Sequence, residues 1–140
     1  MRVVLDTNVV VSAFIWQGPP YRLLEAAARG DIKLFCSIRL MAELNTVLSR
    51  EHLAAKLTAK RSSVHEAIAA YAELVVHVTP AHVPRVVPQD ADDDHVLACA
   101  LAARANLIVS GDKHLLGLGG SYQGIRIVQP TEAVAMIEAG

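Results

Sequence analysis

The sequence predicts an α/β fold in three layers, in which a central, mainly parallel sheet of about five strands lies between helices. Two observations carry this prediction. Short β-branched runs alternate along the chain with longer segments of helical composition. These runs are also apolar on both faces, as in parallel strands that helices cover on each side. With 140 residues, 53% of them hydrophobic, the chain is expected to form one domain, residues 1–140, with a well-filled interior.

In the first half of the chain, the sequence predicts two strands and several helices. Residues 2–5 (RVVL) form a β-branched run that ends at Asp6, whereas the pattern of residues 7–15 fits either a strand or a helix. The other elements follow in order: a loop over residues 16–20, a helix over 21–29 that Gly30 ends, a strand over 32–36, and a mostly helical region over 37–74 that begins at Ser37.

The second half predicts three more strands. Residues 75–78 form a strand, and the three prolines of residues 79–91 favour a loop. The remaining elements are a helix from about Asp92 to Ala105, a strand over 106–110, a turn at 111–112, a short segment over 113–120, a strand over 125–128 and a final helix over 131–139.

Charge and cysteine content indicate the kind of partner and the cellular compartment to expect. The net charge is -1, but residues 22–61 hold eight Lys and Arg against four Asp and Glu, which fits a solvated helical surface or a phosphate-binding face. Cys36 and Cys99 lie in apolar runs and are expected to be buried, reduced thiols. Asp6 and Asn8 interrupt the apolar N-terminal segment, so we expect a cytoplasmic protein with no membrane association.

Two aspartates directly follow predicted strands. Asp6 follows residues 2–5 and Asp112 follows residues 106–110. In open parallel α/β sheets, ligands bind beyond the carboxyl ends of the strands, at the point where the strand order reverses. Both aspartates are therefore candidate ligand-binding residues, although an aspartate in this position also serves as a turn former or as the cap of the next helix.

Two further carboxylates are placed by helical periodicity. Glu43 falls inside an apolar stripe, where a charge requires a partner, unless the helix is rotated so that Glu43 lies on its wet margin. Asp94 directly precedes the buried side of its helix and fits a cap or a ligand. Its neighbours Asp92 and Asp93 are expected to be solvated or to lie behind the ligands. The stripe around Glu43 consists of Leu40, Leu44, Val47 and Leu48.

If these four carboxylates converge, they form an all-oxygen site. Such a site suits Mg²⁺ or Mn²⁺, and a bound cation relieves the repulsion within the run of Asp92, Asp93 and Asp94. The six histidines show no paired helical spacing, so they are expected to be scattered on the surface, and Zn²⁺ fits poorly.

Three blocks of the sequence resemble the PIN-domain family of nucleases, most closely the bacterial PIN toxins of toxin-antitoxin pairs (VapC-like). They are VVLDTNVVVSAF, AELNTVLSR and DADDDHVLACALAARANLIVSGDKHLL, and the resemblance covers residues 1 to about 117. It implies a PIN-like fold whose four acidic metal-binding positions are Asp6, Glu43, Asp94 and Asp112. Asn8, Ser110 and Asp92 would support them. Three residues depart from the family's usual pattern: Ser110 in place of threonine, Asn106 in place of aspartate and Ala91 in place of proline.

The resemblance implies a metal-dependent endoribonuclease that hydrolyses RNA phosphodiester bonds with Mg²⁺ or Mn²⁺. It also implies a small antitoxin protein as partner and a homodimer. Lys113, His114 and the basic residues of the 22–61 region are candidates for contacts to the RNA backbone. The alternatives are a non-catalytic PIN-like domain that binds RNA or protein, a housekeeping RNA-processing nuclease, and a phosphatase of the haloacid dehalogenase type, whose DxD[TV] motif residues 6–9 approach.

Overall fold

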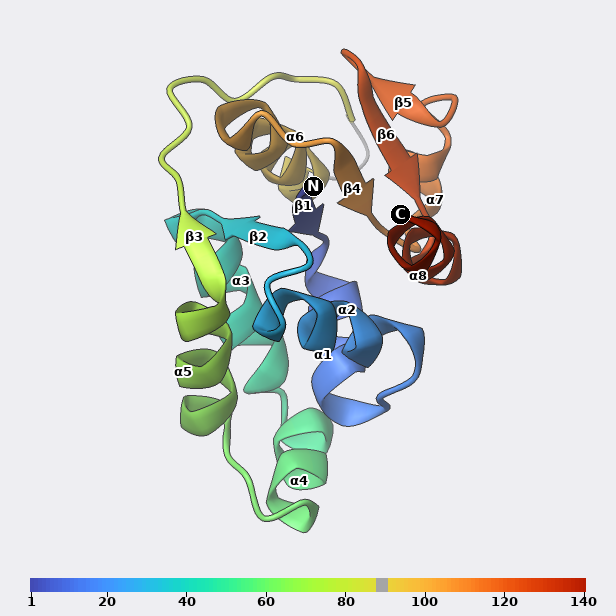
Figure 1. The fold of residues 1–140 in the computed structure, drawn as a ribbon. Helices are drawn as coiled ribbons and strands as arrows, with labels where there is room; N and C mark the ends of the chain where they lie inside the picture. The colour runs from blue at the N-terminus through green and yellow to red at the C-terminus, as the bar shows by residue number, and fades with distance from the viewer. Residues whose placement is uncertain (88–90) are drawn as a thin grey trace.

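The computed structural model describes residues 1–87 and 91–140. It confirms the predicted α/β class, with a mostly parallel sheet between layers of helices (Figure 1). The strand order is β3-β2-β1-β4-β6-β5. The first five of these strands are parallel: β3 (Val75–His77), β2 (Lys33–Cys36), β1 (Arg2–Leu5), β4 (Leu107–Val109) and β6 (Ile125–Val128).

The sixth strand, β5 (Ser121–Tyr122), is antiparallel to β6 and was not predicted. It has only two residues, too few for an alternating pattern to be visible in the sequence. Gln123 and Gly124 connect it to β6, with φ angles of 47° and 82°. Two successive residues with positive φ are typical of the tight turns that match the twist of an antiparallel hairpin.

Helices cover both faces of the sheet. Helix α6 lies on one face, and α1, α2, α3 and α5 lie on the other (Figure 1). The helices are α1 (Thr7–Ile15), α2 (Pro19–Ala28), α3 (Ile38–Leu48), α4 (Glu51–Ala59), α5 (Val64–Leu74), α6 (Ala91–Ala103), α7 (Lys113–Leu116) and α8 (Pro130–Ala139). Within the described residues, no helix has the length and apolar character needed to cross a bilayer.

The ambiguous segment after β1 is a helix. Asp6 caps α1 with its side chain, which accepts a hydrogen bond from the backbone N–H of Thr7 at 2.8 Å. The β-branched residues of α1 are buried among the sheet and the neighbouring helices, as Val9, Val10 and Ile15 show. Capping and burial therefore outweigh the weak preference of valine for strands.

The order of the strands reverses between β1 and β4. From β1 the chain builds β2 and β3 on one side of the sheet, and then returns to place β4 on the other side of β1. Leu5 of β1 is in register with Val109 of β4, and the N–H of Asp6 donates to the carbonyl of Val109 at 2.9 Å. The first residues after the two strands, Asp6 and Ser110, therefore emerge side by side.

The predicted loop after β3 is confirmed over residues 79–87, which form neither helix nor strand. Residues 88–90, the next part of that prediction, lie outside the described residues. Helix α6 begins at Ala91, one residue before the predicted start.

Candidate metal centre

A chain of polar contacts links the ends of β1 and β4. The Ser110 hydroxyl donates to Oδ2 of Asp6 at 2.7 Å and accepts from the backbone N–H of Asp112 at 2.9 Å. Asp112 caps α7 by accepting the N–H of His114 at 2.7 Å. Ser110 is fully buried, and Asp6 is 6% exposed. One hydroxyl thus fixes the carboxylate of Asp6 and the backbone of the segment that carries Asp112.

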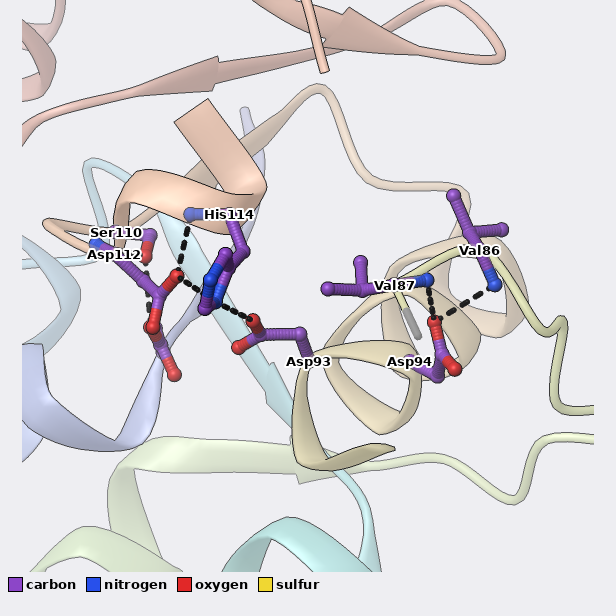
Figure 2. A network of polar contacts seen from close by, with 8 residues as sticks. Val86, Val87, Asp93, Asp94, Ser110, Asp112 and His114 are labelled. Atoms are coloured by element: carbon purple, nitrogen blue, oxygen red, sulfur yellow. Dashed lines mark hydrogen bonds and ion pairs between the residues drawn. The ribbon is translucent and has the colours of Figure 1, made fainter. Parts of the chain in front are cut away.

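Asp93, at the start of α6, lies close to this series of polar contacts. Nδ1 of His114 lies 3.8 Å from Oδ2 of Asp93 and 3.4 Å from Oδ1 of Asp112. Figure 2 shows the imidazole ring between these two carboxylates. The ligand atoms of Asp93, Asp112 and His114 all lie within 4.8 Å of one another. They come from the starts of two helices, α6 and α7.

Asp94 has a different environment from the one expected. Its Oδ1 accepts hydrogen bonds from the backbone N–H groups of Val86 and Val87, at 3.0 and 2.8 Å. Successive residues of a helix point about 100° apart, so Asp93 and Asp94 cannot both face His114. Figure 2 shows the Asp94 carboxylate directed toward Val86 and Val87 instead.

Asp93, by contrast, is 3% exposed. Of the two expectations for it, a solvated side chain or one behind the ligands, the first is therefore wrong. One of its carboxylate oxygen atoms lies within 4.8 Å of the ligand atoms of Asp112 and His114. The structure therefore brings Asp93, rather than Asp94, toward the ends of β1 and β4.

Glu43 lies in α3 and is half-buried. Asp92, whose side chain is 47% exposed, lies 3.4 Å from the guanidinium of Arg39. Glu43 and Asp92 belong to a hollow of about 250 Å³ between α3 and the start of α6, lined by Arg39, Ala42, Glu43, Thr46 and Asp92. Asn8, a predicted supporting residue, is exposed in the first turn of α1.

The sequence did not predict that His114 lies beside Asp93 and Asp112, since it was expected on the surface as a candidate contact to RNA. Its side chain is 32% exposed, and its Nδ1 is buried and makes no hydrogen bond within the described chain. The position two residues after Asp112, directly behind a predicted strand end, is the only signal the sequence holds.

The donor chemistry of this group fits a divalent cation. Two carboxylates and one imidazole are brought together, and the carboxylate of Asp6 is linked to them through Ser110. Carboxylate oxygens are preferred ligands of Mg²⁺ and Mn²⁺, while imidazole is better suited to Zn²⁺ and other transition metals. The group therefore has the ligand types of a metal centre without defining one ion. We call Asp6, Asp93, Asp112 and His114 the acidic centre.

Acidic side chains gathered where the strand order of a parallel sheet reverses are typical of α/β domains that bind a ligand at this edge of the sheet. The family model described as PIN domain matches residues 2–114, so the chain belongs to the PIN domain family. No curated protein matched the sequence. Among solved structures, the chain is similar to the crystal structure of FitAcB from Neisseria gonorrhoeae, with a TM-score of 0.56 over 92% of this chain and 98% of that chain. The two sequences are 16% identical, so this likeness concerns the fold alone.

Proposed function

We propose that this protein is a metal-dependent endoribonuclease that hydrolyses RNA phosphodiester bonds with Mg²⁺ or Mn²⁺. The observation that carries the proposal is the convergence of Asp93, Asp112 and His114, with Asp6 joined to them through Ser110, at the carboxyl ends of β1 and β4. Membership of the PIN domain family supports it.

The carboxylates of Asp6, Asp93 and Asp112 would hold the cation. Glu43 of α3, which lines a hollow together with Asp92, would join them. A bound divalent cation supplies a more acidic water molecule and stabilises negative charge on the phosphate oxygens. Asp6, Glu43 and Asp112 are thus metal ligands that the sequence also suggested, and we propose Asp93 as the fourth ligand in place of Asp94. Support for the exchange comes from the two backbone hydrogen bonds that Oδ1 of Asp94 already accepts from Val86 and Val87.

The other polar residues would hold the carboxylates in place. Ser110 orients Asp6 and the backbone N–H of Asp112, and it is shielded from water by complete burial. Asp94 fixes residues 86–87 against the first turn of α6, so it positions the helix start that carries Asp93. We assign Asp94 and Ser110 as positioning residues for this reason.

Cleavage of a single-stranded RNA in the presence of Mn²⁺, of Mg²⁺ or of EDTA tests the proposal. We expect cleavage with either metal, none with EDTA, and at least a hundredfold slower cleavage by Asp6→Asn, because removing one electrostatic group from a catalytic site typically costs roughly 10²- to 10³-fold. Circular dichroism of Asp6→Asn checks that the fold is intact. Absence of cleavage by the wild-type protein, with RNA still bound, would instead favour a non-catalytic RNA-binding domain.

We further propose that the nuclease is the toxin of a type II toxin-antitoxin pair, acts in the cytoplasm as a homodimer and is inhibited by a small antitoxin protein. The resemblance of the three sequence blocks to bacterial PIN toxins supports this role. Co-expression with the product of a small adjacent reading frame should relieve growth inhibition and yield a stable complex. A nuclease that is active but harmless to the cell, and that binds no such product, would point to housekeeping RNA processing.

A further inference from the structure

Helix α4 carries a row of basic side chains. His52, Lys56 and Lys60 are spaced four residues apart and therefore lie on one face of the helix. Arg50 precedes the helix and Arg61 follows it. Trp16, at the C-terminal end of α1, contacts this row through Lys56. We call this surface the α4 patch; it consists of Trp16, Arg50, His52, Lys56, Lys60 and Arg61.

The structure separates the Lys and Arg residues of positions 22–61 into those that form ion pairs and those that do not. Three cations form ion pairs: Arg22 with Glu138, Arg29 with Asp31, and Arg39 with Asp92. Arg50, Lys60 and Arg61 are exposed and form no ion pair with any residue in the described part of the chain. Residues 50–61 contain one carboxylate, Glu51. The α4 patch therefore keeps a positive potential that attracts anions.

Trp16 gives this cationic surface an aromatic face. Its side chain is 65% exposed, although a tryptophan is usually well buried. Nζ of Lys56 lies 4.5 Å from the centroid of the Trp16 ring. This cation–π contact holds the indole beside the basic row. Leu53 and Leu57, on the inner side of α4, are buried and fix the helix to the body of the protein.

We propose that the α4 patch binds single-stranded RNA, with backbone phosphates at Lys56, Lys60 and Arg61 and a base stacked on Trp16. Proteins that bind single strands combine a row of cations with exposed aromatic rings, because every nucleotide offers both a phosphate and a flat base. An acidic polypeptide offers charge but no regular supply of flat rings. The inference rests on the proposed function, since it gives the substrate of that nuclease a second binding surface.

The α4 patch is distinct from the acidic centre. Asp6 caps the start of α1 and Trp16 caps its end, so the two residues are separated by roughly 15 Å along the helix axis at 1.5 Å per residue. Figure 1 shows α4 at the opposite end of the molecule from α6. A bound strand that reaches both sites must therefore extend over several nucleotides.

Fluorescence anisotropy with a labelled oligouridine of about 12 nucleotides, within the usual site size for such surfaces, tests the inference. EDTA is present, so that cleavage does not occur. Trp16→Ala should weaken binding roughly 5- to 150-fold, the range expected when one base no longer stacks on an aromatic ring, while Trp16→Phe keeps most of the affinity. Lys60→Glu should reduce the slope of log K against log salt by about 0.7 for each phosphate that the variant no longer neutralises.

Arg29→Glu is the matched control, because it makes the same change in net charge at a cation outside the patch that is already paired with Asp31. If Arg29→Glu weakens binding as much as Lys60→Glu, or if Trp16→Ala binds as the wild type does, the patch is not the RNA site. Binding of polyglutamate in place of the oligouridine would also overturn the inference and indicate a protein-binding surface.

The two proposals fail in different ways. If RNA cleavage with Mn²⁺ requires Asp6 but binding is indifferent to Trp16, the nuclease stands and the α4 patch does not. If oligouridine binding requires Trp16 but no metal supports cleavage, the patch stands and the nuclease does not.

Discussion

Asp93 and Asp94 are adjacent in the sequence and chemically identical, yet the fold gives them different surroundings. Asp93 faces Asp112 and His114, whereas Asp94 accepts two backbone N–H groups from residues 86–87. The sequence could predict a carboxylate at the head of α6 but not which of the neighbours faces the centre. That choice depends on the rotation of the helix, and hydrogen bonds from a segment without a recognisable motif help to set it.

The paired substitutions Asp93→Asn and Asp94→Asn separate the two roles. Asp93→Asn should weaken Mn²⁺ binding at least tenfold, because it removes a charged candidate ligand. Asp94→Asn should leave Mn²⁺ affinity within about threefold and lower the free energy of unfolding by about 1 kcal/mol, since two hydrogen bonds lose their charged acceptor. Isothermal titration and urea denaturation measure the two effects. The opposite pattern would restore Asp94 as the ligand.

Ser110 offers a second test at the residue scale. Ser110→Ala removes a donor to Asp6 and an acceptor for the N–H of Asp112, which should cost about 1–3 kcal/mol in free energy of unfolding because the site is buried. Ser110→Thr keeps the hydroxyl and should retain both the Mn²⁺ affinity and the cleavage rate better than Ser110→Ala does. Equal metal affinity and cleavage rate in the two variants would argue against a positioning role for the hydroxyl.

Among the elements, the five parallel strands were predictable because each lies in a short run rich in β-branched or other apolar residues that is bounded by turn or helix signals. Strand β5 and the helical state of α1 were not, since the first is too short and the second depends on burial by its neighbours. His114 was missed for a related reason. Its neighbour Asp93 is 21 positions away in the sequence (114 − 93) and meets it only after α6 and α7 pack.

Because the thiols of Cys36 in β2 and Cys99 in α6 are buried, we expect the protein to lose stability in alkaline solution. Burial raises the pKa of Cys36 from 9.0 to about 11 and that of Cys99 from 9.0 to about 12. Between pH 9 and 11 the unfolded chain releases these protons and the folded chain keeps them, so the free energy of unfolding is highest below pH 9 and falls as the pH rises.

Urea denaturation at pH 8 and pH 10 measures this loss, which should reach roughly 1–3 kcal/mol for the two thiols together at pH 10. The double variant Cys36→Ala, Cys99→Ala should show a smaller fall. A residual fall is expected from Tyr71, because burial also raises the pKa of its hydroxyl well above 10.0. A fall as steep as that of the wild type would contradict the assignment to the cysteines.

Across the whole molecule, a net charge of -1 conceals two regions of opposite character. The acidic centre lies at the strand-order reversal between β1 and β4, and the α4 patch lies at the far end of α1. The fold creates this polarity by gathering Asp6, Asp93 and Asp112 from three elements while it leaves the cations of α4 without acidic partners in the described chain. A negatively charged RNA strand would thus be attracted by the α4 patch, whereas at the acidic centre it would require a bound cation.

Anomalous diffraction from a crystal grown with Mn²⁺ shows directly whether the acidic centre binds a metal ion. We expect a manganese peak in contact with the carboxylates of Asp93 and Asp112, close to that of Asp6. No peak there at saturating Mn²⁺, or a peak held by Asp94 in place of Asp93, would contradict this expectation.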